Sequence, residues 1–337
     1  MNYCGIDLAS KSSDICIVNE KGKVLRRRAV DTESSDIGKA LDGFGQLKVI
    51  IEASPLAEMV ARIIEAHGHI AVIIDARAAK NLMSAMKKTD RRDAQTLAEI
   101  GRCGWYVEVH KKSAEARQMR SILQARQALL KSNKALGASI RGLLRSHGIR
   151  LGAVSKGQFA VRVKEVTAQE VPGLLPALTG MLEAWTLTGQ QAKQLRQSMI
   201  KECKQDEASA YLESVPGIGP LISTAYRATI DDPQRFQREE EIGDYLGLAP
   251  RIYQSGEMEY RGRITKQGDT MLRSLLVEGA HVLLTKGKDC ALKRWGLSLE
   301  KRKGSAKAKV AVARKLAVLL WRLWKDKKMF EAFPQRV

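Results

Sequence analysis

The sequence lacks the features that would place it in a membrane or outside the cell. It has no run of about 18 or more apolar residues, so no segment is expected to span a bilayer. Its first residues, MNYCGIDLAS, show no basic stretch followed by an apolar one, so no secretory signal is expected. Five scattered cysteines without CxxC spacing argue against a disulfide framework and against a zinc site. We therefore expect a cytoplasmic protein with reduced thiols and no membrane partner.

Positive charge is in large excess, and two short segments carry it. The 337 residues have a net charge of +20. Residues 111–160 hold 11 basic side chains and one acidic side chain, and residues 301–337 hold 12 and two. Concentrated basic surfaces of this kind are typical of proteins that bind nucleic-acid phosphates. A lysine-rich face that only promotes solubility is the alternative.

The first 110 residues have the pattern of an α/β domain. Three β-rich runs follow one another with only short turns between them, at 3–9, 14–20 and 23–30. Such short connections allow only an antiparallel meander. Helices and apolar strands then alternate, at 34–44, 47–53, 54–68 and 69–76. The order β-β-β-α-β-α-β is that of ribonuclease-H-like nuclease domains.

The second of these helices has clear start and stop signals. Ser54 is the expected N-cap, Pro55 the first helical residue, and Gly68 the stop.

The rest of the chain is predicted to be mostly helical. An apolar residue recurs every seven positions between 113 and 147, at Ile122, Leu129, Leu136 and Leu143. This spacing predicts a long amphipathic helix that resembles a coiled-coil strand. Such a stripe usually packs within its own chain, but the length of this one also favours self-association. A second helical stretch at 176–212 is expected to return antiparallel to it, and 148–172 shows no readable pattern.

The last third of the chain contains a compact turn and a glycine-rich loop. The segment SVPGIGPLIS (214–223) lies between two helical stretches. It is either a helix-hairpin-helix element, whose exposed amides, at Gly217 and Gly219, would bind phosphates, or a simple turn. A Gly-, Ser- and Arg-rich loop within 245–284 is expected to lead into an apolar helix, and a basic helix follows Lys301. We expect three regions, at 1–110, 111–210 and 211–337.

Four carboxylates could form a metal site. Asp7 lies within an apolar strand, where an unpaired charge is costly, and Glu52 ends the strand expected beside it. Asp90 and Asp93 are three residues apart on the first turns of a helix, and so share one face. Hard oxygen ligands of this kind suit Mg²⁺ or Mn²⁺, and two such ions can promote phosphoryl transfer. Asp75, at another strand end, is a weaker candidate.

The alternative is that these carboxylates are structural. They would then be N-caps, surface groups and ion-pair partners, with Arg91 and Arg92 available as cations.

Several segments resemble one family, the DEDD-type insertion-sequence transposases, which includes pilin-gene invertases and RNA-guided recombinases. The similar segments cover nearly the full length in the same order: GIDLASKSSD (5–14), the Glu of IIEAS (50–54), KTDRRDA (88–94), SVPGIGPLIS (214–223) and GLAPRIYQSGEMEYRGRITKQGDTMLR (247–273). Family members often continue the Glu motif with Gly and an aromatic residue, whereas this chain has Ser54-Pro55-Leu56. That departure concerns the helix entry and leaves the carboxylate in place.

The resemblance implies a RuvC-like first domain whose metal ligands are Asp7, Glu52, Asp90 and Asp93. It also implies a nucleophilic serine in the C-terminal domain, which maps onto Ser255. Nearby cations could hold phosphates, namely Arg251, Arg261, Arg263 and Lys266.

The implied partners are double-stranded donor and target DNA, a structured noncoding guide RNA, and further copies of the chain as a dimer or, on DNA, a tetramer. The implied setting is the bacterial cytoplasm, at the nucleoid during activity. Two other functions are compatible with the residues. One is a RuvC-like junction resolvase, in which water attacks. The other is a nucleic-acid-binding assembly protein without catalysis.

Overall fold

The computed structural model describes residues 1–32, 34–75, 90–255 and 258–333. Side chains are described in these ranges except at 34, 90–92, 252–255, 258–259 and 261. The chain forms two compact units, Met1–Lys112 and Ser113–Val337, and each is treated separately below.

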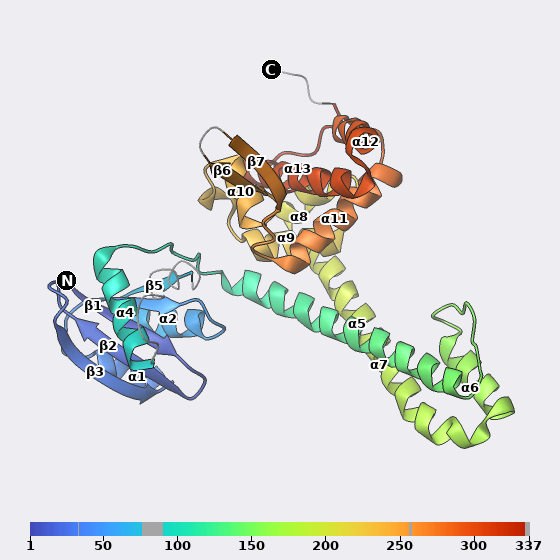
Figure 1. Ribbon diagram of the computed structural model, residues 1–337, viewed down its shortest axis with the longest axis horizontal. Helices are drawn as coiled ribbons and strands as arrows, with labels where there is room; N and C mark the ends of the chain where they lie inside the picture. Colours follow the sequence, from blue (N-terminus) through green and yellow to red (C-terminus); the bar gives the residue numbers. More distant parts are fainter. Residues whose placement is uncertain (33, 76–89, 256–257, 334–337) are drawn as a thin grey trace. The chain divides into compact units, whose positions relative to one another are not determined.

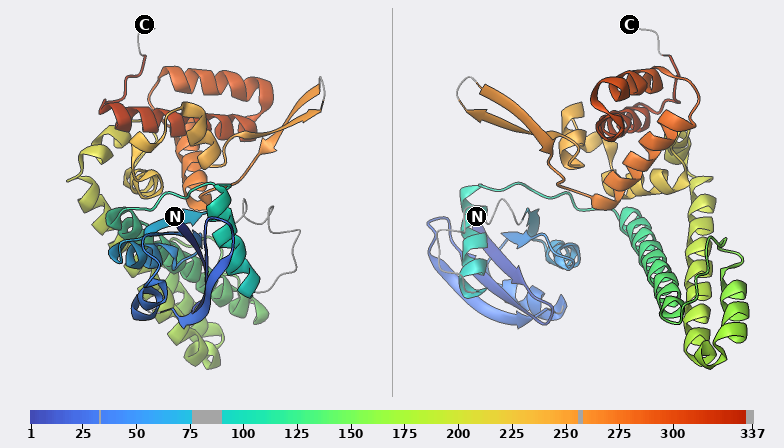
Figure 2. Two further views of the ribbon diagram at one scale, coloured as in Figure 1. Left: turned by 90° about the vertical axis from the view of Figure 1, so that its left-hand side faces the viewer. Right: turned by 45° about the vertical axis from the view of Figure 1, so that its right-hand side comes forward.

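The first unit is built on a five-stranded sheet (Figures 1 and 2). Its strands are β1 (Asn2–Leu8), β2 (Ser12–Val18), β3 (Val24–Asp31), β4 (Leu47–Glu52) and β5 (Ile70–Ile74). Their order across the sheet is β3-β2-β1-β4-β5. The first three strands are antiparallel, as their short turns require, whereas β4 and β5 run parallel to β1. The expected element order β-β-β-α-β-α-β is confirmed.

Helices cover both faces of this sheet. One face packs against α1 (Ser34–Leu41) and α2 (Ala57–Ala66), and the other against α4 (Asp90–Cys103). Alternate residues of a strand point to opposite faces. Accordingly Ile6 and Ile51 lie in the core under α1 and α2, whereas Ile50 packs with Leu97 of α4. Because both faces are covered, the middle residues of the central strands are apolar on both faces.

Gly5 allows α4 to approach β1 closely. A Cβ atom at Gly5 would lie 2.0 Å from the carbonyl oxygen of Ala94 and 2.5 Å from the amide nitrogen of Ala98. Backbone atoms cannot yield as a flexible side chain can, so any side chain here must push the helix off the sheet.

We predict that Gly5→Ala lowers the free energy of unfolding of the first unit by about 2–3 kcal/mol, the upper part of the range for overpacked cores. Urea unfolding of the full chain measures this. Gly142→Ala is the matched control, because a Cβ at Gly142, within a helix, meets nothing within 4 Å. The control should be neutral or stabilising by up to about 1 kcal/mol. Equal effects from both substitutions would contradict the close approach.

The entry to α2 differs from the sequence prediction. The helix begins at Ala57, after an N-cap at Leu56 that makes no side-chain cap hydrogen bond, so Ser54 is not the N-cap. The carbonyl of Ser54 accepts from the Ala57 amide at 3.2 Å, which closes a turn where the helix was expected to start. The predicted stop is confirmed, because Gly68 adopts φ +80° directly after the C-cap.

The second unit begins with a long helical hairpin (Figure 1). It consists of α5 (Ala114–Ser146) and α7 (Leu175–Cys203), with α6 (Phe159–Glu170) at its tip. Ser113 caps α5 by accepting from the Ala116 amide at 3.1 Å. Asn133 of α5 donates to the carbonyl of Trp185 in α7, which ties the middle of the hairpin. The long helix and its antiparallel return are therefore confirmed, and α6 fills the segment without a readable pattern.

The remaining elements form a helical core with one projecting β-hairpin (Figure 2). They are α8 (Glu207–Glu213), α9 (Pro220–Ile230), α10 (Glu239–Tyr245), β6 (Pro250–Ser255), β7 (Met258–Ile264), α11 (Thr270–Thr285), α12 (Ala291–Lys303) and α13 (Ser305–Asp326). The buried hydroxyl of Tyr226 donates to the carbonyl of Ala317 at 2.6 Å and joins α9 to α13. Trp321 is buried and Trp324 packs against the same core.

Two sequence predictions for this unit were wrong. The stretch 176–212 is two helices, because Asp206 caps a new helix by accepting from the Ser209 amide at 2.5 Å. The expected Gly-rich loop is a β-hairpin, in which Tyr253 pairs with Tyr260. Its sequence hides this because glycines and arginines interrupt the usual alternation of strands.

All five cysteines are free, as expected. Within the described ranges, no helix is both long and apolar enough to cross a membrane.

Candidate active site

Asp7 and Glu52 lie at adjoining strand ends on the same face of the sheet. Strands β1 and β4 are parallel with Ile6 opposite Ile51, so the next residues along each strand are Asp7 and Glu52. Gly5 and Ile50 face α4, and strand alternation therefore places both carboxylates on the α4 face. Both side chains are half-buried. The parallel register that the apolar strands require thus brings together the first two predicted ligands.

The first turn of α4 lies level with this pair. A Cβ at Gly22, in the turn between β2 and β3, would lie 3.0 Å from Glu99, whereas Gly5 meets Ala94. Helix α4 therefore runs antiparallel to β1, and its N-terminus lies at the end of β1 that carries Asp7. Asp93 is half-buried in this first turn, where the positive end of the helix dipole favours anions. The helix begins at Asp90, whose side chain lies outside the described residues.

A further carboxylate, Asp14, was missed in the sequence. It lies directly opposite Asp7 in the antiparallel β1–β2 pair, and so on the same face. Side chains in such pairs have Cβ atoms about 4.5–5.5 Å apart, and like charges there repel. Only part of this signal is present in the sequence, because pairing the expected runs 3–9 and 14–20 end to end sets Asp14 opposite Ala9, on the face of Asp7, and the observed register moves it opposite Asp7.

The described side chains stop short of a closed metal site. No group of three or more His, Cys, Asp or Glu side chains in the described ranges lies close enough together to hold an ion. Asp75 follows β5, whose residues Ala71 and Ile73 lie in the core under α1 and α2. By strand alternation Asp75 belongs to that opposite face, so it does not join the predicted set.

Ser255 lies at the end of the projecting hairpin. It is the last residue of β6 and pairs with Met258 across the turn. The side chains of Ser255 and Arg261 lie outside the described residues, whereas Arg251, Arg263 and Lys266 are exposed. Cations therefore line the base of the hairpin, where the sequence predicted phosphate contacts.

The segment between α8 and α9 joins the two helices through a tight turn. Gly217 has φ +93°, and a Cβ there would lie 2.6 Å from the carbonyl oxygen of Gly279 in α11. Gly217 is therefore needed for packing, whatever it binds. Gly219 precedes α9, and a Cβ there would meet nothing within 4 Å, so Gly219, unlike Gly217, is not needed for packing.

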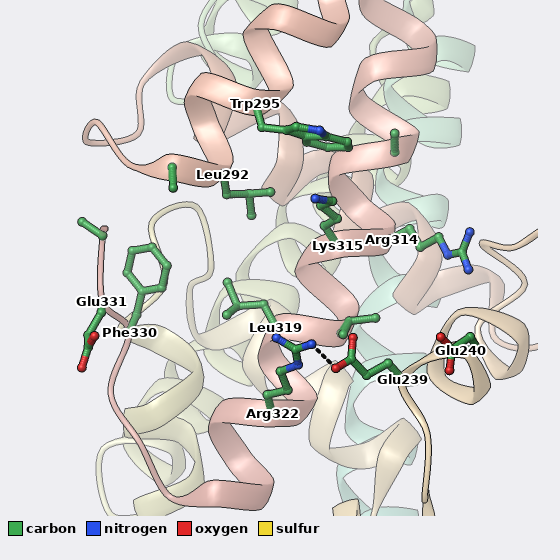
Figure 3. Close-up of a pocket in the computed structure, with 14 residues that line it drawn as sticks. Glu239, Glu240, Leu292, Trp295, Arg314, Lys315, Leu319, Arg322, Phe330 and Glu331 are labelled. Carbon is green, nitrogen blue, oxygen red and sulfur yellow. Dashed lines mark hydrogen bonds and ion pairs between the residues drawn. The ribbon is translucent and has the colours of Figure 1, made fainter. Parts of the chain in front are cut away.

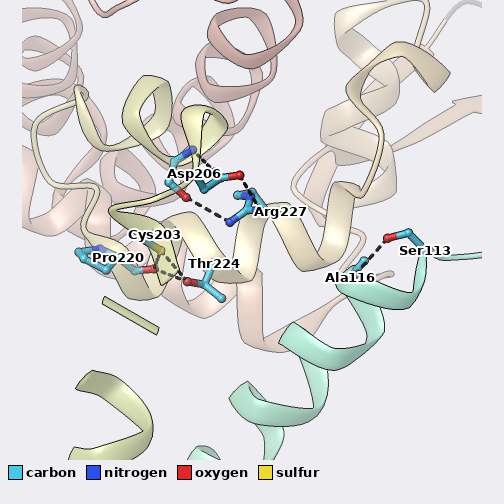
Figure 4. A network of polar contacts seen from close by, with 8 residues as sticks. Ser113, Ala116, Cys203, Asp206, Pro220, Thr224 and Arg227 are labelled. Carbon is cyan, nitrogen blue, oxygen red and sulfur yellow. Dashed lines mark hydrogen bonds and ion pairs between the residues drawn. The ribbon is translucent and has the colours of Figure 1, made fainter. Parts of the chain in front are cut away.

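Polar contacts hold this turn in place (Figure 4). Asp206 caps α8 and also forms an ion pair of 2.9 Å with Arg227 of α9. The thiol of Cys203 and the hydroxyl of Thr224 are 3.1 Å apart and add a second link, from α7 to α9. The two helices that flank the turn, α8 and α9, are thus fixed to each other, and α9 is also fixed to α7 of the helical hairpin.

A cavity lies elsewhere in the second unit, between α10, α12, α13 and the segment after α13 (Figure 3). Its volume is about 750 Å³. Lys315 lies 4.1 Å from the ring centre of Trp295, and Arg322 pairs with Glu239. None of the predicted catalytic residues lines this cavity.

The buried cysteines are poor nucleophiles. Burial raises the pKa of the thiols of Cys4, Cys16 and Cys203 above its ordinary value. These three groups stay protonated near neutral pH and lack the thiolate that attacks phosphorus or carbon centres.

Comparison with known proteins gives a consistent answer. A family model described as "Transposase", of the IS110 DEDD type, matches residues 4–149. A second, described as "Transposase IS116/IS110/IS902 family", matches residues 209–295. The transposase for insertion sequence element IS1111A of Coxiella burnetii is 30% identical over 332 residues, which cover 95% of this chain and 88% of that one.

Two further relatives have similar names and lengths. A Pseudomonas aeruginosa protein named "Probable family 20 transposase" is 30% identical, with 96% of each chain covered. The transposase for insertion sequence element IS1328 of Yersinia enterocolitica is 23% identical, with 94% of this chain and 95% of that one covered. The fold and these matches define a transposase of an insertion sequence. The chain belongs to the IS110 family of DEDD-type transposases.

Membership in this family has direct consequences for chemistry. The substrate is DNA, and the DEDD-type domain implies that its cleavage depends on a divalent metal ion.

Proposed function

We propose that this transposase is an RNA-guided DNA recombinase that cuts and rejoins strands through a phosphoserine intermediate in a Mg²⁺-dependent reaction. The observation that carries the proposal is the register of β1 and β4, which sets Asp7 beside Glu52 at the level of the first turn of α4. Residues 1–110 are then a RuvC-like domain of ribonuclease-H type, 111–210 a basic helical region, and 211–337 the domain with the nucleophile.

The carboxylates at the ends of β1 and β4 have the chemistry that a divalent ion requires. Asp7 faces Asp14 across two strands, and a cation would relieve the repulsion between them. Glu52 lies on the same face and Asp93 in the first turn of α4 above it, and Asp90 would be the fourth ligand. Carboxylate oxygens are the ligands that Mg²⁺ prefers, and Mn²⁺ can replace it. When bound, the metal would lower the pKa of the attacking hydroxyl and stabilise the charge on the leaving oxygen.

Ser255 is the proposed nucleophile. Its Oγ forms a bond to the scissile phosphorus while the bond from that phosphorus to the leaving DNA oxygen breaks. The serine proton passes to solvent or a nearby base, and the leaving oxygen takes up a proton to become a hydroxyl. Arg251, Arg261, Arg263 and Lys266 would hold the flanking phosphates by charge-assisted hydrogen bonds. The acidic site and Ser255 that act together would come from different subunits.

The proposed partners rest on the two basic segments and on one exposed leucine of α5. The basic segments 111–160 and 301–337 would bind the backbones of a structured guide RNA and of donor and target DNA, and base pairing would select the sequence. The amides around Gly217 and Gly219 would add phosphate contacts. On α5, Leu143, the last residue of the heptad row, is 37% exposed and would pack against a second copy in a dimer, and in a tetramer on DNA.

The proposal is tested by trapping the intermediate. Protein is incubated with its copurifying RNA, labelled donor and target DNA, and Mg²⁺, and then denatured. A protein–DNA adduct that resists denaturation is expected, and cleavage without any adduct would favour a junction resolvase that uses water.

Asp14 should contribute to metal affinity without being essential. We predict that Asp14→Asn weakens Mn²⁺ binding about 3- to 10-fold, because removing one nearby negative charge is worth about 1 kcal/mol at a half-exposed site. Titration of Mn²⁺ followed by electron paramagnetic resonance measures this. Asp31→Asn, at the exposed end of β3, is the control and should leave the affinity unchanged. Tighter binding by the Asp14 variant would contradict the placement.

A further inference from the structure

The tip of the helical hairpin is a small module with its own core. The end of α5, all of α6 and the start of α7 enclose a cluster that includes Ile140, Leu144, Phe159 and Leu178. The module lies at the end of the hairpin remote from α8–α13 (Figure 1). With 33 residues, α5 is about 50 Å long, since a helix rises 1.5 Å per residue.

A pocket of about 470 Å³ opens on this module, and its lining is cationic: Arg141, Arg145, Ile149, Arg150, Leu151 and Gly152. Its shape is built into the fold. The amide of Ile149 donates to the carbonyl of Leu144 at 3.0 Å, and the buried Ile149 side chain holds the loop against α5. Arg141 donates to the carbonyl of Gly152 at 3.1 Å and closes the loop from the other side. These contacts bring Arg150 beside Arg145.

The positive charge of this pocket is not neutralised by the protein. The sequence has no Asp or Glu from residue 116 to residue 164. Among the side chains described, no carboxylate forms an ion pair with Arg141, Arg145 or Arg150. Elsewhere in the module, Arg162 does pair with Glu165, at 3.6 Å. Arg141 and Arg145 are one helical turn apart, where like charges repel, so an anion in the pocket would stabilise this arrangement.

We propose that this pocket binds backbone phosphates of a nucleic acid and acts as a second grip, remote from the core of the second unit. Arginine guanidinium groups match phosphate oxygens in geometry, and a transposase already has a nucleic-acid substrate. The length of α5 exceeds one turn of B-DNA, which is about 34 Å. The pocket can therefore contact a different turn of a duplex from the turn that the helical core of the second unit contacts. The inference rests on the proposed function of the basic segment 111–160.

The test compares two double variants that change the net charge equally. Arg145→Gln with Arg150→Gln removes the pocket charge. Arg162→Gln with Arg238→Gln is the control, because both arginines are exposed and already paired with a glutamate, Glu165 or Glu241. Fluorescence anisotropy measures binding to a duplex of about 40 base pairs and to an RNA hairpin of similar length, between 50 and 200 mM salt, where phosphate contacts dominate.

We expect the pocket variant to bind at least one of the two long probes about 10-fold more weakly, with a salt slope smaller by about 1–2, as expected for one or two lost phosphate contacts. The probe that responds identifies DNA or RNA as the ligand. A duplex of about 10 base pairs, too short to reach both grips, should show no difference. Equal binding of both long probes by the pocket and control variants would overturn the proposal and leave an acidic protein surface as the partner. The adduct assay described above tests the proposed recombinase separately, because it does not require the tip.

Discussion

Replacing Asp7 by Asn, or Glu52 by Gln, is expected to reduce metal-dependent strand cleavage by about 10³-fold or more, which corresponds to about 4 kcal/mol of transition-state stabilisation. The amide keeps the size of the side chain and removes the charge that a divalent ion needs. The two residues lie near the ends of adjacent parallel strands on the α4 face. Each strand supplies one of the two carboxylates, so the metal loses a ligand when either is replaced. The rate of cleavage of labelled donor DNA at saturating Mg²⁺ measures the effect, and Mn²⁺ titration shows whether binding is lost with it.

Asp75→Asn is the matched control for this prediction. It removes a carboxylate from the end of another strand of the same sheet, but on the face covered by α1 and α2. It should leave the cleavage rate within about 2-fold of the unsubstituted protein, a change in activation free energy well under 1 kcal/mol.

If Asp7→Asn and Asp93→Asn both left strand exchange intact, the carboxylates would be structural, and the chain would act as an assembly protein rather than as the enzyme.

Ser255→Ala is expected to abolish the covalent protein–DNA adduct completely, because the alanine side chain has no atom that can bond to phosphorus. Affinity for DNA should change by less than about 2-fold, since the cations of the hairpin remain. Electrophoresis of labelled DNA under denaturing conditions measures the adduct, and anisotropy measures the binding.

Ser274→Ala provides the control for the loss of a hydroxyl. Ser274 is exposed on α11, and its hydroxyl donates only to the carbonyl of Thr270, one turn earlier. The adduct should form normally in this variant. Cleavage that persists in Ser255→Ala with no adduct would assign the attack to water and would favour the junction resolvase.

Local patterns in the sequence predicted most of the first unit correctly. The short turns expected at 10–13 and 21–22 could only produce an antiparallel meander, and the structure has it. The heptad row from Ile122 to Leu143 predicted α5 with an error of one residue at each end. Gly68 marked the end of α2, because only a residue tolerant of positive φ fits there.

The sequence predicted helix boundaries wrongly where a residue makes a contact that its neighbours in the sequence do not reveal. Ser54 has the composition of an N-cap, but its carbonyl closes a turn and the helix starts at Ala57. Asp206 splits the predicted helix 176–212, because its side chain caps α8 while forming an ion pair with Arg227. Both outcomes depend on what surrounds the segment, which a window of neighbouring residues does not contain.

By itself, the sequence determined which residues could take part in metal chemistry and on which element each one lies. Strand and helix periods are local properties, so they place Asp7, Glu52 and Asp93 without any knowledge of packing. Only the tertiary structure decided which of these residues are neighbours. The parallel register of β1 and β4 joins the first two, the antiparallel register adds Asp14, and Gly5 lets α4 lie close to the sheet near Asp93. Such pairings are long-range, because each strand finds its neighbour by burying a shared core and not through its own residues alone.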